Sequence, residues 1–273
     1  MGAAIDDDMY LLGGLDVSGV SSADVYRISP ATERVALVGQ LAVPTHGGAA
    51  VALGKRILIF GGADFAPDDL VQAFDPASGT TTVIGHMPSD RADLVAVLVG
   101  GRVILLAGFS GVAFVSEVWA TRDGRSFSVV GKLAEDVRYP AVAVVGSTIY
   151  LFGGLVAGGE YDGTYSTTVQ SFDVATGRSA VVGHLPSPLG HARAAVLSGW
   201  VLVFGGWTPA GASSLVWRFD PITGAVTRAG TLPEAVADEA IAAIGNRVYL
   251  ASGLGSAQQP LVRIGSLSVI ASP

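Results

Sequence analysis

The sequence contains no cysteine. This absence excludes disulfide bonds, thiolate metal sites and thiol nucleophiles. It leaves the compartment open, because a secreted domain with a large core needs no disulfides. Only 14% of the residues are charged whereas 50% are hydrophobic, so the composition is far too apolar for a disordered chain. The 273 residues suit one large β domain or two ordinary domains.

Positive charge and long apolar runs are also scarce, and each scarcity argues against a class of partner. The formal net charge of −7 argues against nucleic acid and against an anionic membrane surface, since both require a basic face. No apolar run reaches the roughly 18 residues of a membrane helix, so no membrane insertion is expected. The first residues, MGAAIDDDMY, lack a basic segment and a long apolar core, so no signal peptide is expected.

One apolar phrase that ends in glycine occurs six times. The copies recur every 46 to 52 residues and are MYLLGG (9–14), ILIFGG (57–62), VILLAG (103–108), IYLFGG (149–154), VLVFGG (201–206) and VYLASG (248–253). Each copy predicts a buried strand, followed by a backbone turn at which no side chain fits. A repeat of this length indicates a fold built from one recurring unit.

The residues around each copy complete a pattern of four short strands. A strand of small residues precedes the phrase, as in GGAAVAL (47–53). A variable loop follows it, then a third strand that ends in an Asp-Pro turn, as in VQAFDPASG (71–79), and a fourth strand such as TTTVIG (80–85). Helical periodicity is nearly absent. The sequence therefore predicts an all-β fold, a six-bladed β-propeller of four-stranded antiparallel blades.

We expect residues 1–273 to form a single propeller domain, because one repeat cannot bury both of its faces alone. The repeats run approximately over 2–42, 43–88, 89–134, 135–186, 187–233 and 234–273. The two ends start and stop in phase with the repeat. We therefore expect either closure by packing alone or a chain that is part of a longer protein.

The pattern resembles the Kelch repeat. The shared features are the double glycine after the second strand, the period of roughly 50 residues, the aromatic-Asp-Pro turn, and Leu-Pro or Met-Pro pairs such as Met87-Pro88 between repeats. The chain departs from the family in lacking tryptophan on the fourth strand; Trp119 and Trp217 fall on the third strand. The resemblance implies a propeller whose relatives include binding modules, copper oxidases and a sialic-acid mutarotase. The copper oxidases need a cysteine, so no cofactor is expected.

Polar residues gather at one position of the repeat. Fifteen residues before the last glycine stand Gly47, Asp93, Tyr139, His191 and Asp238. In peptide-binding Kelch domains, which the chain resembles, this region lies at the mouth of the central channel and carries ligand-contacting arginines. The candidate ligand-binding residues at this mouth are His46, Arg91, Asp93, Arg138, Tyr139, His191, Arg193, Asp238 and Glu239. They predict a polar pocket in which arginine takes a carboxylate. The structural alternative is solvated charges that pair with one another, Arg91 with Asp93 and Arg193 with Asp238.

The loops after the glycines add aromatic residues to the same face. The candidates for ligand contact are Phe65, Phe114, Tyr161, Tyr165 and Trp207. Phe109 and Trp207 follow the glycines directly, so they can instead fold back between blades. The long loop at 155–168, which carries Tyr161 and Tyr165, is expected to be exposed.

Catalytic and metal-binding motifs are not found. No nucleophile elbow or zinc-protease motif occurs, and the aspartates at 64, 68 and 69 match no calcium loop. We assign no catalytic residue and no metal ligand. The predicted function is non-catalytic recognition of a protein segment or a glycan by the loop face of a monomer.

Two other functions and the source stay open. The chain can be an enzyme that acts on a small sugar, with Glu239 and Arg138 or His191 as an acid–base pair, or a purely structural domain. The bias toward alanine, valine and glycine indicates a bacterial source. The compartment can be extracytoplasmic, as part of an anchored or secreted protein, or cytoplasmic.

Overall fold

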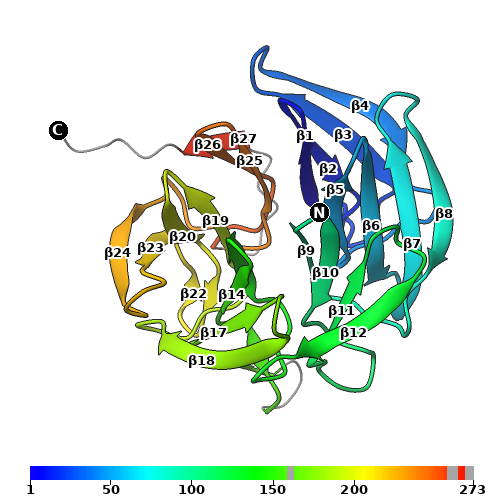
Figure 1. Ribbon diagram of the computed structural model, residues 1–273. Coiled ribbons are helices and arrows are strands. Elements are labelled where there is room, and N and C mark those ends of the chain that lie inside the picture. The colour runs from blue at the N-terminus through cyan, green and yellow to red at the C-terminus, as the bar shows by residue number, and fades with distance from the viewer. Residues whose placement is uncertain (159–162, 257–263, 268–273) are drawn as a thin grey trace. The chain divides into compact units, whose positions relative to one another are not determined.

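The computed structural model describes residues 1–158, 163–256 and 264–267. Every regular element in this part of the chain is a β-strand, so it contains no helix that could cross a membrane (Figure 1). The structure confirms the predicted fold class, an all-β chain of six antiparallel blades of the β-propeller type. The chain divides into two compact units, Met1–Gly131 and Lys132–Pro273, each of which is described by itself.

The first unit contains blades 1 to 3, and in each blade the strands pair in chain order. Blade 1 consists of β1 (Gly2–Ile5), β2 (Asp8–Leu12), β3 (Asp24–Ser29) and β4 (Arg34–Gln40). Blade 2 consists of β5 (Ala49–Leu53), β6 (Arg56–Ala63), β7 (Pro67–Asp75) and β8 (Thr80–His86). Blade 3 consists of β9 (Val95–Val99), β10 (Arg102–Leu106), β11 (Glu117–Thr121) and β12 (Phe127–Lys132).

The second unit contains blades 4 to 6. Blade 4 consists of β13 (Ala141–Val145), β14 (Thr148–Phe152), β17 (Thr168–Asp173) and β18 (Arg178–His184). Blade 5 consists of β19 (Arg193–Leu197), β20 (Trp200–Phe204), β23 (Leu215–Phe219) and β24 (Val226–Thr231). The described part of blade 6 consists of β25 (Ala240–Ile244), β26 (Arg247–Ala251) and β27 (Ile264–Leu267). Two short hairpins, β15 (Leu155–Val156) with β16 (Thr164–Tyr165) and β21 (Trp207–Thr208) with β22 (Gly211–Ala212), extend the loops of blades 4 and 5.

Aspartate turns join the third and fourth strands, as predicted. In blade 4, Asp173 Oδ1 accepts hydrogen bonds from the backbone amides of Ala175 (3.0 Å) and Thr176 (2.7 Å). Gly177 closes the turn with φ +70° and donates its N–H to the Asp173 carbonyl (2.8 Å). The amide of Thr176 is the main cause that lowers the pKa of Asp173 below its ordinary value. The turn therefore uses the ionised carboxylate as a backbone cap.

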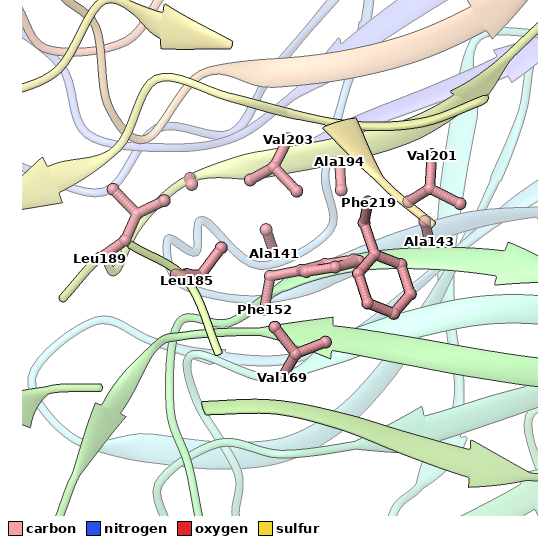
Figure 2. Close-up of a cluster of buried hydrophobic side chains, with 11 residues drawn as sticks. Ala141, Ala143, Phe152, Val169, Leu185, Leu189, Ala194, Val201, Val203 and Phe219 are labelled. Carbon is pink, nitrogen blue, oxygen red and sulfur yellow. The ribbon is translucent and has the colours of Figure 1, made fainter. Parts of the chain in front are cut away.

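Within each unit, adjacent blades pack through small residues on the first strand and large residues on the next two. Figure 2 shows this core in the second unit, where Ala141 and Ala143 of β13 lie near Phe152 of β14 and Phe219 of β23. The two phenylalanine rings meet edge to face, with centroids 5.1 Å apart at 76°. The sequence analysis predicted a strand of small residues before each apolar phrase, and Ala141 and Ala143 of β13 agree with it.

The double glycine after the second strand lets two backbone segments approach closely. At Gly205, φ is +60° and an added Cβ would lie 2.3 Å from the carbonyl oxygen of Val236. At Gly206, φ is +95° and an added Cβ would lie 2.7 Å from the Cβ of Ala192. Both positions therefore require glycine for two reasons, the left-handed backbone and the absence of space.

Two alanine variants separate the cost of the left-handed backbone from the cost of the missing space. Gly199 has φ +80° but no atom near its would-be Cβ, so Gly199→Ala is expected to cost only the conformational penalty of about 1–2 kcal/mol. Gly205→Ala adds the collision with Val236 and is expected to lower the free energy of unfolding clearly more. Urea titration of both variants measures the difference. Equal losses would show that the close approach at Gly205 contributes nothing.

Candidate functional site

A backbone bridge fixes the linker that enters each of blades 2 to 6. The residue after the double glycine exchanges two hydrogen bonds with the linker; for example, Trp207 N–H donates to the Gly190 carbonyl (2.7 Å) and Gly190 N–H to the Trp207 carbonyl (2.9 Å). The same bridge occurs five times, as His46–Ala63, Ala92–Phe109, Arg138–Leu155, Gly190–Trp207 and Ala237–Leu254. The bridge therefore fixes the backbone of the linker beside the end of the second strand.

The residue that follows the bridge adopts the left-handed conformation in each of these blades. The φ angles are +62° at Gly47, +58° at Asp93, +53° at Tyr139, +55° at His191 and +58° at Asp238. This conformation is uncommon for tyrosine and histidine and costs of order 1 kcal/mol or more each. Residues held in such conformations cluster at functional sites, so these five positions are candidates for function.

The left-handed residues of consecutive blades are joined by their backbones. His191 N–H donates to the Tyr139 carbonyl and Asp238 N–H to the His191 carbonyl, both at 3.0 Å. In the first unit, Asp93 N–H donates to the Gly47 carbonyl at 2.6 Å. The second unit therefore presents Tyr139, His191 and Asp238 as neighbours, which we call the Tyr-His-Asp row.

The side chains of the Tyr-His-Asp row contact one another. The rings of Tyr139 and His191 stack with centroids 3.9 Å apart at 24°. His191 Nδ1 lies 2.8 Å from Asp238 Oδ1. Tyr165 of β16 approaches the imidazole edge to face at 6.4 Å. The imidazole is thus fixed on three sides, by a stacked ring, an edge-on ring and a carboxylate.

Arg138 contacts both the ring and the hydroxyl group of Tyr139. Its guanidinium carbon lies 4.6 Å from the centre of the Tyr139 ring, and its Nη2 donates to the Tyr139 hydroxyl at 3.1 Å. A cation over an aromatic face is an attractive contact. Arg138 therefore orients the tyrosine on which His191 stacks.

The electrostatics of the row favour an ionised Asp238. Burial alone would raise the pKa of Asp238, but the hydrogen bond and charge of His191, the charge of Arg193 and a hydrogen bond from Trp207 outweigh it and lower the pKa. An ionised Asp238 is an acceptor for a hydrogen bond from His191 Nδ1, which leaves Nε2 as the ring nitrogen that Asp238 does not engage. The sequence analysis considered Arg193 as the partner of Asp238; the hydrogen-bond partner is His191.

Glu239, the next residue, lies inside the second unit. It has no exposed surface, and both carboxyl oxygens lack a hydrogen-bond partner among the described residues. Burial raises its pKa to about 8, against the charge of Arg193, which lowers it. Arg193 itself is bound to backbone, with Nε donating to the Glu239 carbonyl (2.6 Å) and Nη1 to the Ala192 carbonyl (3.2 Å). Glu239 therefore holds its proton at neutral pH and does not form part of the exposed site.

The candidate residues of the first unit are not gathered in one row of side chains. His46 Nδ1 lies 2.9 Å from Ser21 Oγ, on the loop of blade 1. Asp93 is nearly buried, and its Oδ1 lies 2.7 Å from where a Cβ of residue 47 would be, which explains glycine at that position. His46 and Asp93 therefore lie in the linkers that enter blades 2 and 3. His46 contacts Ser21, and the backbone N–H of Asp93 donates to the Gly47 carbonyl.

Arg91 belongs to the interior of the first unit. It has no exposed surface; its guanidinium carbon lies 3.6 Å from the ring centre of Trp119, and Nη1 donates to the Glu117 carbonyl (3.1 Å). Burial lowers its pKa to about 10. Its place in the repeat is held by Leu189 and Val236 in other blades, which are also buried. Packing on Trp119, rather than contact with a ligand, is the role that this geometry supports.

A relative found by sequence comparison carries the name of the repeat family that the sequence resembles. No protein-family model matches the chain. The Kelch-like protein terF of Aspergillus terreus is 26% identical to it over 240 residues, which cover 80% of this chain and 51% of that protein. This sequence similarity agrees with the six sequence repeats and with the six blades of the structure. The chain is similar to Kelch-repeat β-propeller proteins in its sequence, its repeats and its blades. It spans about half the length of the curated relative that it matches, and Kelch propellers commonly serve as protein-interaction modules.

The loop aromatics of the chain differ in exposure. Phe65 is 100% exposed at the β6–β7 turn. Phe109 and Phe114 are half-buried and meet edge to face at 5.9 Å, and Tyr165 and Trp207 are half-buried beside the Tyr-His-Asp row. Tyr161 lies outside the described residues. Phe65 is thus the one described candidate aromatic whose side chain is fully presented to solvent.

Two exposed aliphatic side chains on the equivalent loops were not among the residues predicted from the sequence. Val17 is 87% exposed and Val112 is 91% exposed. Both lie between the second and third strands of their blades, as Phe65 does. A search for any large apolar residue in these loops would have found them. The described residues contain no group of three or more histidine, aspartate or glutamate side chains that could hold a metal ion.

The raised pKa of Glu239 predicts a dependence of stability on pH. The folded protein holds this proton more tightly than the unfolded chain, so stability is complete below the ordinary pKa of 4.5 and falls as the pH rises toward about 8. Glu239→Gln removes the ionisation. The stability of this variant relative to the natural protein is expected to increase between pH 5 and pH 9 in urea titrations.

A control removes a carboxylate from the surface. Glu33 is exposed on the turn between β3 and β4, so Glu33→Gln is expected to show no comparable trend with pH. A constant difference between Glu239→Gln and the natural protein at both pH values would contradict the assignment.

Proposed function

We propose that this protein is a recognition module and that the Tyr-His-Asp row of its second unit binds the ligand, a protein segment or a glycan. The observation that carries the proposal is the fixed imidazole of His191. Its Nδ1 is engaged by Asp238, and no hydrogen bond within the described residues involves its Nε2. Nε2 is therefore the ring nitrogen that remains for a ligand.

The surroundings of His191 suit a ligand that is partly polar and partly apolar. Tyr165 and Trp207 are half-buried, so each keeps some ring surface toward solvent. Aromatic rings bind sugar faces and apolar side chains, whereas Nε2 forms a hydrogen bond with a hydroxyl or amide group. The imidazole is held in place before binding, so little ordering entropy is lost on association.

The test compares binding by the natural protein with binding by His191→Ala and Asp238→Asn. A glycan array and a displayed peptide library serve as the probes, and any ligand found is titrated by calorimetry. We expect His191→Ala to weaken binding at least roughly tenfold, because a central polar contact is lost. Asp238→Asn is expected to weaken it less, because the imidazole stays in place but is no longer oriented by a charge.

His86→Ala is the matched control, since His86 is exposed on β8 and pairs only with Asp69 among the described residues. It is expected to bind as the natural protein does. Ligands that bind His191→Ala with unchanged affinity, or the absence of any ligand in both libraries, would overturn the proposal.

A second candidate function is an enzyme that acts on a small sugar, in the manner of a mutarotase or epimerase. It is favoured by two neighbouring carboxyl groups with opposite pKa shifts, an ionised Asp238 paired with histidine and a protonated Glu239. Exchange of sugar anomers, followed by NMR with and without the protein, tests it. Acceleration that is lost in both His191→Ala and Glu239→Gln would support catalysis, and no acceleration would refute it.

A further inference from the structure

A polar cleft of about 370 Å³ lies on blade 1 of the first unit. Its volume is in the range of sites that bind small molecules. Its walls come from β2, β3, β4 and the turn that joins β3 to β4. The residues that line it are Asp8, Arg27, Ser29, Thr32, Arg34 and Ala36. The cleft therefore combines two guanidinium groups, one carboxylate and two hydroxyl groups.

The strand register brings these side chains to one face of the blade. Arg27 and Ser29 are two residues apart on β3, so their side chains point to the same side. On β4, Arg34 pairs with Ser29 and Ala36 pairs with Arg27. Arg27 and Arg34 are therefore diagonal neighbours on this face, and the residue opposite Arg27 is only an alanine.

Asp8 forms one side of the cleft. Its Oδ1 accepts a hydrogen bond from Ser29 Oγ, and its Oδ2 lies 3.8 Å from Arg27 Nε. A carboxylate accepts about four hydrogen bonds, so Asp8 keeps acceptor capacity for a further donor. Its side chain is 29% exposed, so a molecule in the cleft can reach it.

Arg34 is the guanidinium group that a ligand can engage. Its side chain is exposed, and it takes part in no hydrogen bond or ion pair within the described part of the chain. Guanidinium groups bind carboxylates and phosphates through two parallel hydrogen bonds. The group that fits beside Arg34 is therefore an oxyanion.

Blade 1 departs from the repeat at residues that build this cleft. Asp8 stands directly before the apolar phrase of its blade. The equivalent residues in the other blades are Arg56, Arg102, Thr148, Trp200 and Arg247. The carboxylate at this position is thus a property of blade 1 and not of the repeat.

The turn between β3 and β4 departs in the same way. Ser29 holds the place of Asp173, which caps the equivalent turn in blade 4, and its hydroxyl group is bound to Asp8 instead. Glu33 holds the place of Gly177 and adopts φ +54°. A left-handed glutamate is strained, and strained residues cluster at functional sites. The repeat forms this turn without these substitutions, which indicates that they serve a role other than folding.

The charges in and around the cleft determine which oxyanion fits. Its lining carries one net positive charge, because Asp8 offsets one of the two arginines. Asp6, Asp7 and Glu33 are exposed next to it in the sequence and repel a second negative charge. A singly charged carboxylate is therefore favoured over a phosphate dianion.

We propose that this cleft binds a small hydroxy acid. The carboxylate of the ligand pairs with Arg34, with Arg27 beside it, and a hydroxyl group of the ligand donates to Asp8. The cleft lies in the first unit and shares no residue with the Tyr-His-Asp row, so binding here does not depend on binding there.

Gluconate, hexanoate, glucose and glucose 6-phosphate are probes of similar size that separate these contacts. Each is titrated into the whole chain at low ionic strength, where exposed charges are least screened, and binding is followed by ligand-detected NMR. We expect saturable binding of gluconate. Hexanoate is expected to bind more weakly because it lacks hydroxyl groups, glucose because it lacks the charge, and glucose 6-phosphate because it carries a second negative charge.

Two variants test the roles of the charged residues. Arg34→Gln is expected to weaken gluconate binding roughly tenfold or more, because a charged hydrogen-bond partner is lost. Asp8→Ala is expected to abolish the preference for gluconate over hexanoate, because the acceptor for the hydroxyl group is gone. Hexanoate is expected to bind this variant at least as well as it binds the natural protein.

Arg178→Gln is the matched control, because Arg178 holds the place of Arg34 in blade 4 and is also exposed. This variant is expected to bind gluconate as the natural protein does. His191→Ala is expected to bind it normally as well, so failure of this cleft and failure of the Tyr-His-Asp row are distinguishable.

Three results would overturn the proposal. They are equal binding of hexanoate or glucose, unchanged binding by Arg34→Gln, and no saturable binding of any probe. Tighter binding of glucose 6-phosphate than of gluconate would overturn the assignment to a carboxylate and would indicate a phosphate monoester instead.

Discussion

The rest of the structure depends on the backbone bridge between each linker and the residue after the double glycine. The bridge forms only because no side chain stands between the two segments; a Cβ at Gly206 would lie 2.8 Å from the Gly190 carbonyl oxygen. Where the first glycine is replaced, Ala107 and Ser252 still adopt φ +61° and +60°. The geometry is therefore kept even where the residue is less suited to it, which indicates that the close approach governs the backbone at this corner.

The bridge also determines how the candidate site is made. Once the bridge fixes the linker, the next residue adopts the left-handed conformation. The N–H groups of Asp93, His191 and Asp238 then donate to the carbonyl of the equivalent residue in the preceding blade of the same unit. Tyr139, His191 and Asp238 are neighbours because blades 4, 5 and 6 are consecutive. The repeat supplies the positions and the side chain at each position supplies the chemistry, which is how one fold serves many functions.

Much of the fold and part of the site could be predicted from the sequence. The spacing of the glycines predicts the strands, and alignment on the last glycine selects Tyr139, His191 and Asp238 as equivalents. Equivalence does not reveal contact, so the pairing of Asp238 with His191 rather than Arg193 had to come from the structure. The burial of Glu239 was missed because Asp238, the residue before it, turns with φ +58°, so its neighbour just before β25 can face the interior. The burial of Arg91 was missed although its equivalents Leu189 and Val236 are apolar and buried.

The position of Glu239 bears on the choice between recognition and catalysis. Asp238 and Glu239 have pKa values shifted in opposite directions, an arrangement that enzymes use for acid–base chemistry. A general acid must come within hydrogen-bond reach of the group that it protonates. Glu239 has no exposed surface, so it cannot reach a ligand bound at His191 without a rearrangement of the backbone that precedes β25. The fixed imidazole needs no such movement to bind a ligand through Nε2. This difference favours recognition over proton transfer at the Tyr-His-Asp row.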